Sequence, residues 1–128
     1  MFRIFVYLWT LPTTCLGLLF FPLAMISGEA HLVDGVLELN GRWIEFLLSH
    51  LTPIPGGAAA MTLGHVVIGR DRHCLEFTRK HERVHVRQCE RWGPLFIPAY
   101  LTASVFVKLR GRDAYMDNPF ERAAYNRE

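Results

Sequence analysis

The feature that most constrains this chain is an uncharged apolar stretch near its amino terminus, "IFVYLWTLPTTCLGLLFFPLAMI", residues 4–26. As a helix rising about 1.5 Å per residue, it is long enough to cross a hydrocarbon layer of ~30 Å. Pro12 and Pro22 are compatible with this, because membrane helices tolerate proline better than soluble helices do. We therefore predict a transmembrane anchor in residues 1–28 and one compact domain in residues 29–128.

The residues that flank this stretch indicate whether it is cleaved and how it is oriented in the membrane. Gly28 and Ala30 in "SGEA" form a small-x-small pattern that suits cleavage of a signal peptide, but the apolar run exceeds the usual core of about 7–15 residues. We therefore expect a retained anchor. Arg3 precedes the stretch, so the positive-inside rule favours a cytoplasmic amino terminus. The prediction is a single-pass membrane protein whose C-terminal domain is extracytoplasmic.

A second apolar stretch, "PLFIPAYLTASVFV", covers residues 94–107. It is short for a membrane span and is better interpreted as a buried helix or one that skims the membrane. Lys108, Arg110 and Arg112 follow it and would also suit a cytoplasmic stop, which would place the carboxyl terminus inside. From these residues alone, both topologies stay open.

The charge pattern argues against a nucleic-acid partner. The formal net charge is +2, and of the 14 Lys and Arg residues only Arg3 and Arg42 precede Arg70. Acidic residues are interspersed through this basic half, and no recognised nucleic-acid module occurs in it. We expect no nucleic-acid binding.

Short elements are expected between the anchor and the basic half. The Asp34-Gly35 pair between apolar residues predicts a tight hairpin, because glycine accepts the positive φ needed there. A short helix is expected within residues 40–51, a loop in the "TPIPGGAAA" of residues 52–60, and a strand at residues 65–69. Together with the helices expected later in the chain, this predicts an α+β fold with a small β-sheet.

The strongest chemical motif lies on a predicted helix. No Gly or Pro occurs in residues 75–92, and Gly-Pro follows, which is a usual helix end. Within this helix His81, Glu82 and His85 form H-E-x-x-H. The two histidines lie four residues apart on one face, so both imidazoles can reach one metal ion. Glu82 lies about 100° around the helix, where a carboxylate can act on a metal-bound water.

A metal site of this kind needs a third ligand. Cys89 is four residues beyond His85, but at about 12 Å from His81 along the helix it is too distant and is expected to be a core residue. Gln88 and Arg91 stand where the metzincin pattern requires Gly and His, which excludes that class.

A glutamate in "DNPFERAAYN", residues 117–126, is the remaining candidate for the third ligand. Asn118 can cap this helix, with Pro119 in its first turn. Glu121 then either closes a capping box with Asn118 or binds the metal. Local sequence supports the two roles equally, and the upstream H-E-x-x-H motif favours the role of metal ligand.

A metal-free interpretation also fits the basic helix. Arg79, Arg83 and Arg87 recur every four residues, as a stripe contacting solvent, lipid headgroups or a partner would. The alternative hypothesis is therefore a membrane-anchored, non-enzymatic interaction module with a structural or absent metal site.

The order of these motifs resembles the gluzincin family of zinc peptidases. "HERVH" is followed by the Glu of "PFERAAYN", and residues 56–126 are similar to small membrane-associated bacterial proteins of this type. The resemblance implies a minimal zincin-like domain that hydrolyses peptide or protein substrates with water activated by Zn2+. Carried over residue by residue, it implies His81, His85 and Glu121 as zinc ligands and Glu82 as general base and acid.

The resemblance leaves the oxyanion-stabilising group open. Tyr115 and Tyr125 are candidates, with Tyr115 preferred, and His65 and His73 have suitable chemistry too. The strand at residues 65–69 is expected at a sheet edge, where it would pair with an extended substrate. Because His81 and Glu121 must then lie on one side of the membrane, residues 94–107 are not expected to span it.

Overall fold

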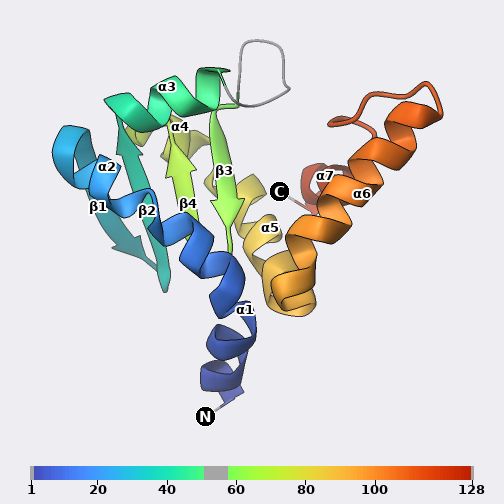
Figure 1. The fold of residues 1–128 in the computed structure, drawn as a ribbon. Helices are drawn as coiled ribbons and strands as arrows, with labels where there is room; N and C mark the ends of the chain where they lie inside the picture. The colour runs from blue at the N-terminus through green and yellow to red at the C-terminus, as the bar shows by residue number, and fades with distance from the viewer. Residues whose placement is uncertain (1, 51–57, 128) are drawn as a thin grey trace.

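The structure is a computed structural model that describes residues 2–50 and 58–127, and it confirms the α+β class. A four-stranded sheet lies between helices, and α6 and α7 extend to one side of it (Figure 1). The elements in chain order are α1 (Phe2–Leu18), α2 (Phe21–Ser27), β1 (Gly28–Val33), β2 (Val36–Gly41), α3 (Arg42–His50), β3 (Ala60–Leu63), β4 (Val66–Gly69), α4 (Arg72–Phe77), α5 (Arg79–Trp92), η1 (Gly93–Leu95), α6 (Phe96–Leu109) and α7 (Pro119–Arg127).

The sheet has the strand order β1-β2-β4-β3. The predicted hairpin joins β1 to β2, with Asp34 at φ 50° and Gly35 at φ 80°. The predicted strand is β4, but its expected place at the sheet edge is wrong, because β4 pairs with β2 on one side and β3 on the other. All of its residues are buried, as the unbroken apolar run of a central strand requires. The edge strand beside α5 is β3, which falls partly inside the predicted loop.

The two faces of the sheet bury different halves of the core. Leu39 and Ile68 pack on one face with α2 and α3, through Ala24, Ile44 and Leu48. On the opposite face a second cluster forms against α4 and α5, from Val36, Val67, Leu75 and Val86. Side chains alternate along β4, so Val67 points away from its neighbours Val66 and Ile68. Helix α5, which carries the H-E-x-x-H motif, therefore packs against the sheet through this second cluster.

The amino-terminal apolar stretch forms two helices, α1 and α2, which are bent by 41° relative to each other. Pro22 lies in the first turn of α2, where its missing N–H is harmless, so a new helix begins there. This pair covers the sheet face that α3 shares, and Ala24 is fully buried in the core. The predicted domain boundary after residue 28 falls within β1, directly after its first residue.

Within the described residues, one continuous helical segment is long and apolar enough to cross a membrane. It is Arg79–Leu109, which joins α5, η1 and α6. The α1–α2 pair meets the same criterion when it is counted as one broken span.

The motif helix is shorter than predicted, because residues 75–92 divide between α4 and α5 at Thr78. The Asp71 carboxylate caps α4 by accepting from the Cys74 amide at 2.7 Å. The Thr78 hydroxyl donates to the Cys74 carbonyl at 2.7 Å, and Thr78 has φ −95° and ψ 2°. A hydroxyl that bonds the preceding turn competes with the helix ladder, which explains the break. The predicted end of the helix at Gly93 is confirmed.

Two other predicted helices are present. The helix expected within residues 40–51 is α3, and the loop expected at residues 52–60 lies largely outside the described residues. The helix expected at residues 117–126 is α7. Asn118 caps it as predicted, because its Oδ1 accepts from the Phe120 amide at 2.9 Å.

Candidate metal centre

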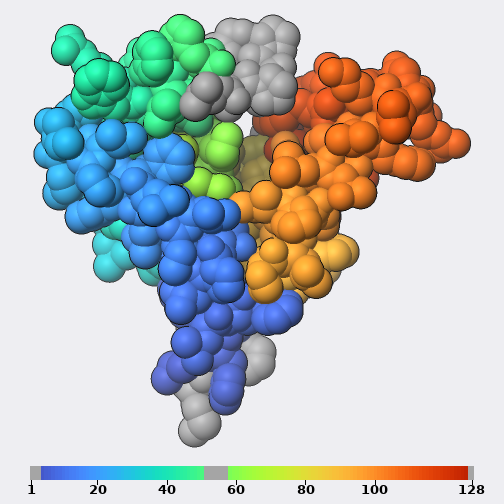
Figure 2. All heavy atoms as spheres, viewed as in Figure 1, coloured from blue at the N-terminus to red at the C-terminus, as the bar shows by residue number. Residues whose placement is uncertain are grey.

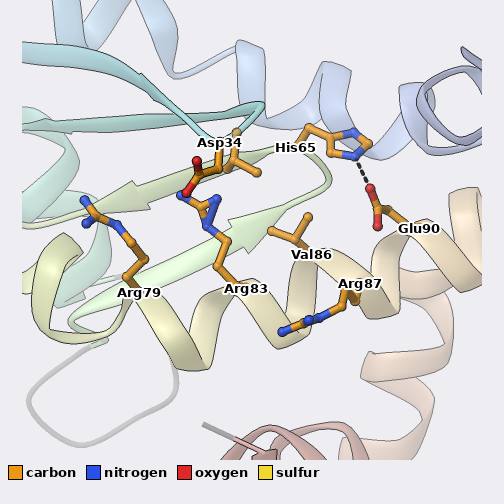
Figure 3. A pocket seen from close by; sticks show the side chains of 8 residues that line it. Asp34, His65, Arg79, Arg83, Val86, Arg87 and Glu90 are labelled. Atoms are coloured by element: carbon orange, nitrogen blue, oxygen red, sulfur yellow. Dashed lines mark hydrogen bonds and ion pairs between the residues drawn. The ribbon is translucent and has the colours of Figure 1, made fainter. Parts of the chain in front are cut away.

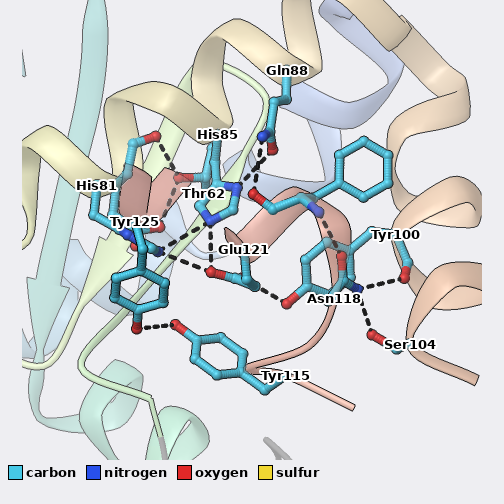
Figure 4. Close-up of polar contacts among 12 residues, drawn as sticks. Thr62, His81, His85, Gln88, Tyr100, Ser104, Tyr115, Asn118, Glu121 and Tyr125 are labelled. Carbon is cyan, nitrogen blue, oxygen red and sulfur yellow. Dashed lines mark hydrogen bonds and ion pairs between the residues drawn. The ribbon is translucent and has the colours of Figure 1, made fainter. Parts of the chain in front are cut away.

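Helices α5 and α7 bring three potential metal ligands together in the interior of the protein (Figure 4). His81 Nε2 lies 2.9 Å from Glu121 Oε1, and His85 Nε2 lies 3.0 Å from the same oxygen. The two imidazole Nε2 atoms are 3.3 Å apart. All three side chains are buried. Their ligand atoms form a compact triangle that could hold a metal ion.

The size of the triangle fits a small tetrahedral ion. Metal–nitrogen and metal–oxygen bonds of about 2.0–2.1 Å place tetrahedral ligand atoms about 3.3 Å apart. The observed separations of 2.9, 3.0 and 3.3 Å are close to this value. Two imidazoles and one carboxylate are also a donor set that suits Zn2+, and they leave a fourth position free.

Gln88 fixes the tautomer of His85. The Gln88 amide nitrogen donates to the Phe120 carbonyl at 3.0 Å, which orients the side-chain amide. Its oxygen then faces His85 Nδ1 at 2.9 Å and can only accept, so the ring proton is on Nδ1. His85 Nε2, the other ring nitrogen, faces Glu121 and is therefore the atom placed to bind a metal. The same side chain ties α5 to α7.

Tyr100 of α6 holds the third ligand from the opposite side. Its hydroxyl donates to Glu121 Oε2 at 2.6 Å, which leaves Oε1 directed at the two imidazoles. Asn118 in turn donates to the Tyr100 carbonyl at 3.1 Å and to the Ser104 hydroxyl at 2.7 Å. The carboxylate of Glu121 is therefore positioned by contacts with both α5 and α6.

These contacts exclude the capping-box role for Glu121, because its two oxygens accept from the histidines and Tyr100. Burial by itself raises the pKa of Glu121, but hydrogen bonds from His81 and His85 outweigh burial and lower the pKa to about 2. The carboxylate is thus ionised at neutral pH, which is the form that binds a metal.

Glu82 lies beside the ligand triangle and faces the sheet. Its Oε1 accepts from the hydroxyl of Thr62, on edge strand β3, at 2.8 Å, and its backbone carbonyl is 3.2 Å from the same hydroxyl. Burial raises the pKa of Glu82, against the opposing effects of His85 and the Thr62 hydrogen bond. A raised pKa brings this carboxylate closer to the range in which a general base works at neutral pH.

The two tyrosines predicted as oxyanion-stabilising candidates lie next to each other at the site. The Tyr125 ring is 4.3 Å from the His81 ring, centroid to centroid, and its hydroxyl is 3.2 Å from the Tyr115 hydroxyl. Burial raises the pKa of Tyr115, and the Tyr125 hydrogen bond adds to this. Of the two tyrosines, Tyr125 is the one whose ring contacts a ligand, and a catalytic role for Tyr115 stays a prediction.

The two other candidate histidines lie elsewhere. His65 Nε2 contacts Glu90 at 2.8 Å on a different side of α5, at a pocket of about 300 Å3 (Figure 3). His73 stacks on Phe77. Neither belongs to the ligand group formed by the described residues. Cys89 is fully buried and free, as expected for a core residue.

Sequence reasoning missed three residues that support the site, and only one of them carried a usable signal. Gln88 follows His85 by three positions on the same helix, where side chains are neighbours. Tyr100 and Thr62 carried no such signal, because their positions depend on the turn after α5 and on which strand lies at the edge.

The fold and the three buried ligands define a small α+β protein with a candidate mononuclear metal centre. No family model matches the chain, and no curated protein or solved structure matches it.

Proposed function

We propose that this protein is a zinc-dependent metallopeptidase with a zincin-like domain. The observation that carries the proposal is the convergence of His81 Nε2, His85 Nε2 and Glu121 Oε1 within 3.3 Å of one another. The carboxylate of Glu82, which lies next to this triangle and is not one of its three ligands, supports hydrolysis over a purely structural site. The gluzincin-like order of the motifs supports the same class.

The proposed roles follow from the positions of the side chains. A bound Zn2+ would polarise the scissile carbonyl and acidify the attacking water. Glu82 would take a proton from that water and deliver it to the leaving amine as the C–N bond breaks. The hydrogen bond from Thr62 holds Glu82 Oε1, so Oε2 is the oxygen left for the proton.

The proposed substrate is a peptide or protein segment that binds in an extended form. The strand suited to pair with it is β3, Ala60–Leu63, because it lies at the end of the sheet and next to α5. Thr62 of this strand contacts the general base directly. A peptide added to the strand would therefore run past Glu82.

Metal analysis combined with peptidase assays tests the proposal. Purified protein should contain about one zinc per chain, which His85→Ala should abolish and Glu121→Ala should weaken. Glu82→Gln should retain the metal and lose turnover, since it removes only the base. Stoichiometric zinc with no cleavage of a broad peptide library would instead favour the structural site of a non-enzymatic module.

We also propose that the protein is a single-pass membrane protein with residues 29–128 on the outer side. The position of Arg3 before the apolar stretch, and the length of the α1–α2 pair, support this. Protease digestion of intact spheroplasts should cut residues in this region. Protection until the membrane is opened would place the domain inside.

A further inference from the structure

Helix α1 has its polar residues toward the protein and its apolar residues outward. Thr10 and Thr13 are 0% and 2% exposed, and the Thr13 hydroxyl donates to the Gly93 carbonyl at 3.1 Å. The outward side of α1 consists instead of large apolar residues, among them Ile4, Phe5, Leu8, Leu11 and Leu16. A helix at a water-exposed surface has the reverse arrangement.

Two more polar contacts attach the same inward face of α1 to the domain. The Thr14 hydroxyl accepts from the His65 amide at 3.0 Å, and the Tyr7 hydroxyl donates to the Gly35 carbonyl at 2.9 Å. Polar groups that join helices and an apolar surface that faces outward are typical of helices packed within a membrane.

Helix α6 shows the same outward pattern. Its inward face carries Tyr100 and Ser104, which hold Glu121 and Asn118 by hydrogen bonds. Its outward arc is apolar and more than half exposed, and comprises Leu101, Val105, Phe106 and Leu109. Over its 14 residues α6 has a single charged side chain, Lys108, in the last turn.

Both helices lie on the near surface of the molecule in Figure 2, α1 in blue and α6 in orange. We propose that the outward faces of α1 and α6 together contact the hydrocarbon of a lipid bilayer, so that the membrane borders the domain along two helices. The apolar faces belong to two separate helices. A bilayer covers both faces more readily than a single docked helix would. Lys108, Arg110 and Arg112 at the end of α6 suit the headgroup layer.

The geometry also limits how α6 meets the lipid. A helix of 14 residues is about 21 Å long, shorter than the ~30 Å hydrocarbon layer. The preceding helix α5 cannot extend this length within lipid, because it carries the buried ligand pair His81 and His85 beside Arg79, Arg83 and Arg87. Helix α6 therefore enters one side of the bilayer without crossing it. Because Tyr100 contacts Glu121 from the inward face of α6, Glu121 then lies on the side of this helix that faces away from the lipid.

Quenching by brominated lipids tests this surface without depending on the metal or on catalysis. The full chain is placed in phosphatidylcholine and phosphatidylglycerol vesicles with brominated acyl chains. One sample carries a fluorophore on the native Cys15 of α1, which is exposed, in a Cys74→Ser background. A second carries it on Val105→Cys in a Cys15→Ser, Cys74→Ser background, where the remaining Cys89 is buried.

Bromine should quench both labels several-fold more than a matched label at Arg87→Cys, an exposed position of α5 on the charged stripe. Leu101→Cys repeats the test on the same arc of α6 should the Val105 variant fail to fold. A label on α6 that iodide quenches and brominated chains do not would overturn the proposal. So would a pyrene excimer at position 105 without bromine quenching, since it would assign the face to a second copy of the chain.

Discussion

At the scale of single residues, the contacts of Gln88 make a specific prediction about metal binding. Gln88→Ala removes the acceptor that fixes His85 Nδ1–H and the bond to Phe120 that ties α7 to α5. Loss of such a supporting contact typically lowers metal affinity by about 10–100-fold. We expect this loss in a zinc competition titration, with a circular dichroism spectrum like that of the unchanged protein.

Two variants control for this effect. Gln88→Glu keeps an acceptor for His85 and should retain more affinity than Gln88→Ala. Arg87→Ala alters an exposed neighbour outside the ligand network and should leave the affinity unchanged. Equal affinities for Gln88→Ala and Arg87→Ala would show that Gln88 does not support the site.

The sequence predicted that the two histidines of the site lie together, but it predicted less well which residues surround them. Spacing of four on a helix is sufficient to bring His81 and His85 to one point. Glu121 required the upstream motif, because Asn118 made a capping role equally plausible. Tyr100 could not be predicted, since its contact depends on the direction in which α6 leaves Gly93, and a Gly-Pro pair does not specify that direction.

At the scale of elements, Gly93 is the point where α1, α5 and α6 meet. Its φ is +59°, and a Cβ there would collide with the indole ring of Trp9. Gly93→Ala should therefore lower the free energy of unfolding by about 3 kcal/mol, from backbone strain plus overpacking. Chemical denaturation in detergent micelles measures this change.

Gly111 provides the matched control for Gly93. It also has a positive φ, +78°, but no atom lies within 4 Å of where its Cβ would be. Gly111→Ala should cost only the backbone strain, about 1 kcal/mol. Adding Trp9→Ala to Gly93→Ala should recover part of the loss, and no recovery would mean that the collision with Trp9 is not the cause.

A buried charge cluster joins β2 to α5 and predicts a pH dependence. Glu38 accepts from Arg79 at 2.9 and 3.0 Å and from Arg83 at 2.9 Å. Burial raises the pKa of Glu38, but the bonds from both arginines outweigh burial and hold the pKa below its ordinary value. A lowered folded-state pKa stabilises the protein above the unfolded pKa of about 4.5, and this stability is lost as the pH falls through the folded value.

Glu38→Gln removes this contribution. Because Arg79 is partly exposed, we expect a loss of about 2 kcal/mol at neutral pH, below the range for a fully buried pair. The difference between the unchanged protein and the variant should shrink as the pH falls below about 4.5. Denaturation of the chelator-treated protein across this range tests it, and a difference that does not vary with pH would contradict the assignment to Glu38.

At the scale of elements, the sequence predicted whether a segment is a helix or a strand more reliably than where that element lies in the fold. The Asp34-Gly35 hairpin is set by local backbone preference and was predictable. The strand at residues 65–69 was expected at an edge and is central, although the apolar run from Val66 to Ile68 is typical of a strand buried on both faces. The break at Thr78 depends on one side-chain hydrogen bond, to Cys74, which helical periodicity does not indicate.

At the scale of the whole molecule, the amino-terminal stretch combines two roles that composition alone does not separate. Its lack of charge predicts contact with lipid, and that inference uses only hydropathy and length. Its inward side nevertheless completes the domain, through Ala24 in the core and Thr14 on the His65 amide. Residues 2–28 are therefore one layer of the fold, in addition to their proposed role as an anchor.

A truncated chain that begins at Gly28 tests this double role. It would lack the cover that Phe20, Leu23 and Ala24 give to Leu39 and Ile68. Each large apolar side chain that loses its burial costs about 2 kcal/mol, and domains of this size are stable by only about 5–15 kcal/mol. We expect residues 28–128 to bind a hydrophobic dye and to unfold without a cooperative transition, whereas the full chain in the same detergent unfolds cooperatively. If the truncated chain instead unfolds cooperatively and binds zinc as tightly as the full chain, residues 1–28 are a separable anchor. The layer they form over the sheet would then contribute little to the stability of the metal centre.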